Sequence, residues 1–517
     1  MMVEIEGSLS WRNVAAVATG ATLALSEAAW QRIDHARALV DVILTRGDRA
    51  YGVNTGVGAL SDTVVGVAEQ RLLSFNIIRS HACGYGEALP KVVVRAIMAA
   101  QINNLGHGFS GIRPEVVDML LTLLNRDLIP LVPSRGSVGY LTHMAYIGLV
   151  LLGEGRGQIG DKVTSGEAML RAAGIAPIVL EAKEGLSLVN GTACSTGIAC
   201  LALSRIERIL NVADVVAALT FDSVGARLDA FRSDIMGLRG SPGAVLSAQR
   251  LLSFLERSRT VSKRSNIRTQ DALSLRAIPH VHGAARDAMQ VSSTIVDQEL
   301  GAVTDNPVVC GTTENPSVFS EAHAVAARLS LTLDGLALAV AQVAAMSERR
   351  IDRLVNPMVS GLPAFVASNP GVQSGYMIAQ YAAVALAGEN RRLASPACLD
   401  GGVTSALQED FLAHPTPSAL KLLSIIDNTE RMLGIELLSA VDALELSGAV
   451  ESRDDPIIEI YRSVRAHVPL YQDDRPLGDH IEVGRQLIVR ELTELNSLEP
   501  SEIRHDVNLS SAVSVPE

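Results

Sequence analysis

The feature that most constrains the fold is a set of long stretches without proline in the C-terminal two thirds of the chain. Residues 320–356 contain no proline, and Pro357 then supplies a stop, because proline lacks the backbone N–H that a helix interior needs. Across residues 201–219 the apolar side chains recur every three or four positions, which is helical rather than strand spacing. Alanine-rich patterns that permit close helix packing complete a predicted bundle of long helices over residues 264–301, 374–393 and 418–446.

The N-terminal part of the chain is instead punctuated by glycine, which marks turns between shorter helices. We therefore predict a mainly α-helical chain, with an N-terminal region over residues 1–200 and a long-helix bundle with C-terminal helices over residues 201–517. The glycines that support this division are Gly52, Gly56, Gly58, Gly84, Gly86, Gly106, Gly108 and Gly111.

Charge and hydropathy narrow the classes of partner. The formal net charge is −12, so the chain has no excess of basic residues for nucleic acid or an anionic membrane, and we expect neither as a partner. The longest nearly uninterrupted apolar run, residues 144–152, is much shorter than the roughly 20 residues that span a bilayer. The first residues, MMVEIEGSLSW, lack the basic start and apolar run of a signal peptide. We expect a cytoplasmic protein whose ligand is small or whose partner is another copy.

The cysteines and histidines do not form a pattern typical of metal binding. The five cysteines are scattered and include no CxxC pair, so we expect reduced, mostly buried thiols. His280 and His282 form the closest histidine pair, and no third ligand stands beside them in the sequence. No metal is predicted.

Residues 49–58, RAYGVNTGVG, form a glycine-rich segment that contains Tyr51. Three glycines in so short a run disfavour a stable helix and predict a mobile loop. Their spacing matches neither the Walker nor the dinucleotide-binding pattern. Two interpretations stay open on these residues alone: Tyr51 anchors a turn, or it reaches into a functional site.

Several short segments, spread in order over nearly the whole chain, resemble the family of histidine, phenylalanine and tyrosine ammonia-lyases and the related aminomutases. The resemblance is nearest to the histidine ammonia-lyase branch. It implies an ammonia-lyase/fumarase-like helical fold, a homotetramer with sites built from three subunits, and elimination of ammonia from a histidine-like or aromatic α-amino acid. It also implies that pyridoxal phosphate (PLP) is not used. The segments include YGVNTGVG (51–58), SHACGYGE (80–87), VPSRGSVG (132–139), AKEGLSLVNGT (182–192), QDALSLR (270–276), TDNP (304–307) and LQED (407–410).

The resemblance implies a cofactor called MIO, 4-methylidene-imidazol-5-one, which forms from an internal Ala-Ser-Gly. Such an electrophile is needed because the β-proton of an amino acid is barely acidic and ammonia is a poor leaving group. In the family the triplet follows the glycine that aligns with Gly139, but here Tyr140 follows directly, and the later spacing to Asn190 is unchanged. Two explanations stay open. The cyclised triplet is one non-standard residue that a string of standard letters omits, or the chain lacks it and cannot form MIO.

The resemblance assigns catalytic roles to three residues. Tyr51 would be the general base that removes the β-proton, on a loop that closes over the substrate. A tyrosine is a weak base at neutral pH, so this role needs positive charge or a helix N-terminus nearby. Asn190 would lie beside the electrophile, where its amide can hold the ring or the substrate carboxylate. Arg276 would grip that carboxylate with paired, charge-assisted hydrogen bonds.

His81 and Glu409 match the two positions that set selectivity for the substrate's side chain. A histidine and a glutamate there suit a substrate that carries an imidazole, so a polar or basic side chain is favoured. The alternative for His81 is a histidine satisfied within its own turn. Further residues expected to line the substrate cavity are Gln270, Phe319 and Gln408.

Two departures from the family pattern stand where the chemistry is expected. Leu273 replaces a tyrosine, which removes a hydroxyl donor near the electrophile. Tyr140 replaces the aspartate that ordinarily follows the triplet, and either Tyr140 or His143 is a candidate for its polar role. These departures support two alternatives to a lyase: an aminomutase of the same family, and a catalytically silent homologue with a binding or regulatory role. The sequence does not separate a lyase from an aminomutase, whereas the retained Tyr51, Arg276 and Glu409 favour an enzyme over the silent homologue.

Overall fold

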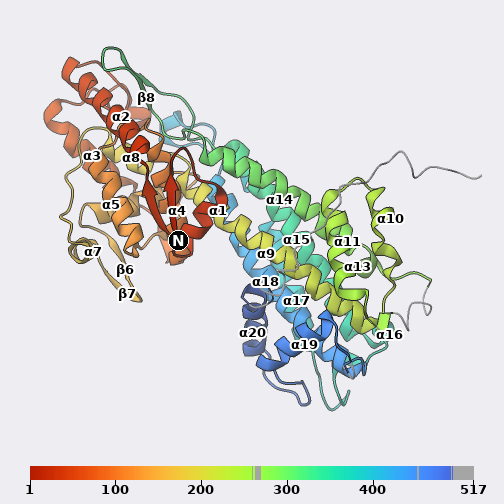
Figure 1. Cartoon of the computed structure of the whole chain (residues 1–517). Helices are drawn as coiled ribbons and strands as arrows, with labels where there is room; N and C mark the ends of the chain where they lie inside the picture. The colour runs from red at the N-terminus through yellow and green to blue at the C-terminus, as the bar shows by residue number, and fades with distance from the viewer. Residues whose placement is uncertain (259, 262–268, 451–452, 491, 493–517) are drawn as a thin grey trace, which may run out of the picture. The chain divides into compact units, whose positions relative to one another are not determined.

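The computed structural model describes residues 1–258, 260–261, 269–450, 453–490 and 492. Within these ranges the chain is mainly α-helical with a few short strands, as predicted (Figure 1). Its contacts divide into two compact units. The first combines Met1–Ser204, Val291–Gly335 and Ser395–Leu423, and the second combines Arg205–Gln290, Leu336–Ala394 and Ser424–Glu517.

The first unit contains short helices and four small sheets. Its sheets are β1 with β2 in parallel, and β3 with β5, β4 with β6 and β7, and β8 with β9 in antiparallel. The helices are α1 (Trp11–Ala18), α2 (Glu27–Arg46), α3 (Gln70–His81), α4 (Lys91–Gly106), α5 (Pro114–Asn125), α6 (Thr142–Leu151), α7 (Gly166–Ala173) and α8 (Glu184–Val189). The strands are β1 (Met2–Ile5), β2 (Thr22–Leu25), β3 (Tyr85–Ala88), β4 (Leu128–Pro130), β5 (Pro133–Arg135), β6 (Arg156–Ile159), β7 (Lys162–Ser165), β8 (Val308–Gly311) and β9 (Pro316–Phe319).

Four long helices each run through both units: α9 (Ala193–Val224), α14 (Ile278–Leu300), α15 (Ala327–Val355) and α18 (Pro415–Leu446). They confirm the helical patterns read over residues 201–219, 320–356 and 418–446. The remaining helices of the second unit are α10 (Ser233–Gly237), α11 (Pro242–Leu255), α13 (Leu273–Arg276), α16 (Pro357–Ser360), α17 (Met377–Leu393), α19 (Pro456–His467) and α20 (Gly478–Val489).

The helix predicted over residues 264–301 is shorter than expected. Residues 262–268 lie outside the described part of the chain, and α14 begins only at Ile278 after the separate short helix α13. The physical reason is Pro279. Proline fits the first turn of a helix but not its interior, and it disfavours helical backbone at the residue before it.

Two helical stretches, 184–224 and 327–355, are long and apolar enough to meet a length and composition test for membrane spans. The most apolar window of the first is entirely buried inside the structure, and that of the second is half buried. A core helix of a globular protein meets the same test, because burial rather than lipid can account for its apolar side chains.

Buried charge is paired in the core of the second unit. Glu436 of α18 accepts hydrogen bonds from the Arg350 guanidinium at 2.6 and 2.9 Å, from Ser347 at 2.6 Å and from Thr220 at 2.8 Å. The side chains of Arg350 and Glu436 are fully buried. This network joins α9, α15 and α18, so both oxygens of the Glu436 carboxylate have partners where water cannot reach them.

Candidate active site

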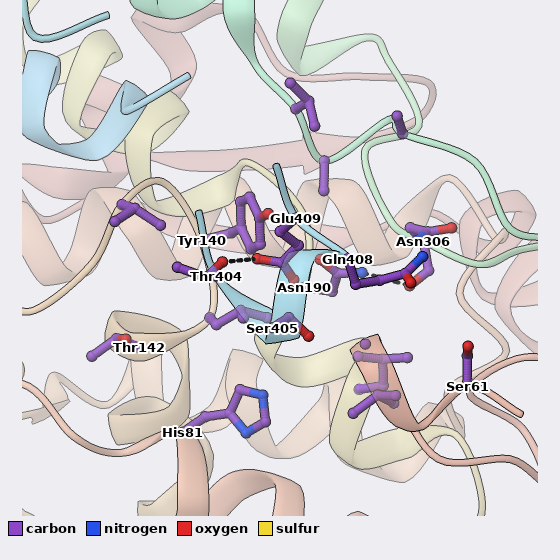
Figure 2. A pocket seen from close by; sticks show the side chains of 18 of the residues that line it. Ser61, His81, Tyr140, Thr142, Asn190, Asn306, Thr404, Ser405, Gln408 and Glu409 are labelled. Atoms are coloured by element: carbon purple, nitrogen blue, oxygen red, sulfur yellow. Dashed lines mark hydrogen bonds between the residues drawn. The ribbon is translucent and has the colours of Figure 1, made fainter. Parts of the chain in front are cut away.

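The first unit contains a cavity of about 890 Å³ (Figure 2). It is lined by turns and helix ends that are distant in sequence, drawn from residues 51–61, 80–83, 136–142, 186–190, 306–325 and 404–411. Among the described residues that line it there are three carboxylates and one histidine, but no lysine or arginine. The cavity is therefore rich in hydrogen-bond acceptors and lacks a permanent cation of its own.

Tyr51 lies on a loop at the cavity wall, as predicted. Helix α2 ends at Gly47, whose φ of 73° closes the helix in the left-handed region. The loop is then fixed by Asn54, whose side chain accepts from the Ala50 backbone N–H at 2.9 Å and donates to the Asp48 carbonyl at 2.8 Å. The Tyr51 hydroxyl oxygen accepts the Gly58 backbone N–H at 3.2 Å.

Asn190 follows helix α8 and is held by the segment around Asn306. Its side-chain amide donates to the Asn306 carbonyl, and both residues line the cavity. The preceding residue, Asp305, forms a buried ion pair with Lys183 at 2.9 Å, and its other oxygen accepts the Asn306 backbone N–H at 2.8 Å. Lys183 also donates to Ser187 at 3.0 Å. A buried charge pair thus supports the backbone that positions Asn190.

The backbone at Gly139 and Tyr140 is held in a hydrogen-bonded turn. Ser137 Oγ accepts the Gly139 N–H at 3.1 Å and donates to the Tyr140 carbonyl at 2.9 Å, while Thr416 donates to the Gly139 carbonyl at 2.8 Å. No Ala-Ser-Gly occurs anywhere in the sequence. The residues present at this turn therefore do not supply the precursor of the MIO electrophile.

His81 ends helix α3, and its ring lines the cavity. Its Nδ1 lies 2.7 Å from the Ile77 carbonyl, which can only accept, so Nδ1 carries the hydrogen. Burial lowers the pKa of His81, against the opposing effects of that hydrogen bond and of the Glu409 charge. Above that pKa the ring is neutral, and its Nε2 is a hydrogen-bond acceptor.

Glu409 is held in a tight turn beside Tyr140. Its backbone exchanges hydrogen bonds with Thr404 at 2.9 and 3.3 Å, and its carboxylate accepts the Thr404 hydroxyl at 2.8 Å. Figure 2 shows the Tyr140 ring next to the Glu409 side chain. Burial and the Glu409 carboxylate raise the pKa of Tyr140 far above its usual range, so this hydroxyl keeps its hydrogen.

The cavity brings together six of the residues singled out in the sequence: Tyr51, His81, Tyr140, Asn190, Gln408 and Glu409. Gly139 stands between two lining residues, Val138 and Tyr140, but does not line the cavity itself. Three others belong to the second unit and do not line it. Of these, Arg276 donates to the Asp271 carbonyl at 3.0 Å, and Gln270 and Leu273 are exposed.

Phe319 also does not line the cavity. It ends strand β9 and is 57% exposed, whereas the residues directly after it, including Glu321 and Val325, form part of the wall. The chain turns after β9, so the residues that follow Phe319 reach the cavity wall while Phe319 itself does not. Thr404, which fixes Glu409, had no signal in the sequence, whereas Asn306 lies in the TDNP segment that carried the resemblance.

Comparisons with known proteins identify the family of the chain. A family model described as "Aromatic amino acid lyase" matches residues 9–466. The chain belongs to the aromatic amino acid lyase family. It is 38% identical over 494 residues to histidine ammonia-lyase of Natranaerobius thermophilus, covering 94% of this chain and 97% of that protein.

Solved structures of this lyase family superpose on nearly the whole chain. The histidine ammonia-lyase of Trypanosoma cruzi is 33% identical, with a TM-score of 0.87 over 96% of this chain and 95% of that one. The tyrosine aminomutase of Streptomyces globisporus is 29% identical, with a TM-score of 0.91 over 98% and 100%. The predicted family and helical fold are confirmed. The matches support a carbon–nitrogen lyase that releases ammonia and do not favour the silent homologue.

Proposed function

We propose that this lyase eliminates ammonia from an α-amino acid with a histidine-like or aromatic side chain, giving an unsaturated acid. The observation that carries the proposal is that Tyr51, Asn190, His81 and Glu409 meet in one cavity. Their types match the base, the amide and the two selectivity residues that the resemblance implies.

The acceptor character of one wall favours a histidine-like substrate over a purely aromatic one. Neutral His81 offers Nε2, and the Glu409 carboxylate offers an oxygen, so both groups accept hydrogen bonds. A bound side chain that lacks N–H or O–H donors would cover these partly buried acceptors without giving them partners, which costs free energy. An imidazole or imidazolium ring supplies such donors.

A cation for the substrate's carboxylate must come from outside the lining described above, because no lysine or arginine takes part in it. We assign this role to Arg276, contributed by another subunit of a homotetramer. Exposed apolar side chains on α15 and α17 of the second unit, namely Leu338, Ile378, Tyr381 and Val384, support burial against further copies. Light scattering should show a tetramer, and a monomer at micromolar concentration would contradict it.

Ammonia elimination in this family uses MIO, which as an electrophile stores the charge that develops during elimination. Its Ala-Ser-Gly precursor would stand between Gly139 and Tyr140. Within the chain's own residues, Tyr51 would accept the β-proton at its hydroxyl oxygen while Asn190 orients the reacting end of the amino acid. We further propose a soluble, cytoplasmic enzyme that uses no PLP and no metal.

Two measurements test the function together. Mass spectrometry of the peptide across Gly139 and Tyr140 should show the added mass of Ala-Ser-Gly less two waters. A panel of free amino acids, including histidine, phenylalanine and tyrosine, should then yield ammonia and an unsaturated acid from at least one member. A β-amino acid product would identify an aminomutase instead. A direct Gly139–Tyr140 bond, with no ammonia from any substrate, would overturn the lyase assignment.

A further inference from the structure

Tyr140, directly after Gly139, stands where the family pattern described above has an aspartate. Tyr140 and His143 are the two candidates for the polar role of that aspartate. The structure distinguishes them. His143 lies on helix α6 with 2% of its surface exposed and does not line the cavity. Tyr140 lines the cavity, and its ring is half buried.

The backbone of Tyr140 is held from the helix that follows it. Its carbonyl accepts the Thr142 N–H at 3.0 Å, and the next residue, Leu141, donates its N–H to the Val189 carbonyl at 3.1 Å. Leu141 has a φ of 74°, a left-handed conformation that a leucine adopts only when its surroundings impose it. Val189 directly precedes Asn190, so the Tyr140 backbone is tied to the segment that carries this catalytic candidate.

Two hydroxyl-bearing side chains on different segments lie beside the Glu409 carboxylate. Thr404 donates to one of its oxygens from within the same turn at 2.8 Å, and the Tyr140 ring, two positions before α6, lies next to the Glu409 side chain (Figure 2). The hydrogen bond from Thr404 engages one carboxylate oxygen and leaves the other able to accept a further donor. A second donor from a separately anchored segment would hold the carboxylate in one direction.

We propose that Tyr140 is a positioning residue, which donates its hydroxyl hydrogen to Glu409 and thereby fixes the direction in which this carboxylate meets the substrate's side chain. The inference rests on the proposed function, because it concerns selectivity at the same site. Tyr140 does not act on the reacting atoms. The shift of its pKa supports a lasting donor, since the hydroxyl stays protonated wherever Glu409 is charged.

The test compares Tyr140→Phe with wild type by titration calorimetry and by steady-state kinetics, using L-histidine and L-phenylalanine as probes. Tyr85→Phe is the matched control, because Tyr85 is 63% exposed on β3 and does not line the cavity. Tyr140→Phe should raise the Kd and KM for histidine on the order of tenfold, the effect of losing one hydrogen bond to a charged group. The values for phenylalanine and the kcat for histidine should change less than about twofold.

A double-mutant cycle with Glu409→Gln separates positioning from general structural damage. Once the carboxylate is removed, Tyr140→Phe should add little further loss of histidine affinity. Additive losses, equal losses for both amino acids, or an unchanged Kd for histidine in Tyr140→Phe would each overturn the proposal. Calorimetry is carried out in the Tyr51→Phe background, in which turnover is suppressed, so that the heat reports binding. A protein that binds histidine selectively but releases no ammonia would refute the lyase function while leaving the role of Tyr140 intact.

Discussion

Replacing Lys183 by methionine should destabilise the first unit in a strongly pH-dependent way. The side chains of Lys183 and Asp305 are 0% and 2% exposed, so each ion is desolvated and depends on the other. Removing one partner of such a buried pair costs about 3–5 kcal/mol, because the remaining charge is left uncompensated. At pH 8 the Lys183→Met variant should therefore lose about that much free energy of unfolding.

The pH dependence follows from Asp305. Burial raises the pKa of this carboxyl group, and the charge of Lys183 opposes the rise. Without Lys183 the folded-state pKa rises further above its unfolded value, so the folded variant binds a proton that the unfolded chain does not. A raised carboxyl pKa means stability that is lost as pH increases through that value. The gap between wild type and variant should accordingly shrink from pH 8 towards pH 5.

Urea unfolding followed by circular dichroism at pH 8, 7, 6 and 5 measures this gap. The control is the double variant Lys183→Met/Asp305→Asn, which removes both charges and keeps an acceptor for the Asn306 backbone N–H. It should recover most of the lost stability, since neutral replacements of buried pairs are often tolerated. A loss that stays constant with pH, or a double variant no more stable than the single one, would refute the reasoning.

Three further predictions concern the site and the second unit. Tyr51→Phe should lower ammonia release by at least about 10²-fold without changing the elution volume of the oligomer, and an active variant would remove Tyr51 from the base role. Burial lowers the pKa of His81, so the KM for histidine should stay constant from pH 8 to about pH 6.5. At lower pH the His81 ring is protonated, its Nε2 can no longer accept a hydrogen bond, and the KM should rise. A rise already above pH 7 would contradict this. Glu436→Ala leaves the Arg350 side chain buried without a counter-charge. Unfolding in guanidinium chloride should therefore show that the free energy of unfolding falls by about 3–5 kcal/mol. A fall below about 1 kcal/mol would refute this.

The sequence predicted the long helices because their signal is local: apolar spacing and the positions of proline fix α9, α15 and α18 within a few residues. It did not predict that each compact unit combines three separate segments, since the long helices pass through both units and contacts between distant segments have no local signature. The predicted boundary at residue 200 lies near the first of these crossings, at Ser204, and it remains a prediction.

The candidate site shows the same division between local and distant information. Tyr51, His81 and Glu409 stand in short motifs that can be read directly from the letters, and the structure places them in one cavity. Thr404 was missed because its role depends on the six-residue turn 404–409 rather than on a motif. Arg276 belongs to the second unit and does not line the cavity, in keeping with the proposal that it serves the site of another subunit.

Recognition and elimination depend on separate parts of this site. His81 is oriented by Ile77, and Glu409 by Thr404, without any bond that involves Gly139. The Tyr140 carbonyl is held from both sides, by Ser137, which also binds the Gly139 N–H, and by Thr142 at the start of α6. The hydrogen bonds that orient His81 and Glu409 therefore do not depend on a residue between Gly139 and Tyr140, whereas the position of Tyr140 does. Selective binding of histidine therefore does not by itself establish the lyase reaction. Loss of ammonia release does not by itself show that substrate binding by His81 and Glu409 is damaged. Mass spectrometry across this bond and calorimetry with histidine are independent measurements, and both are needed to assign the chemistry.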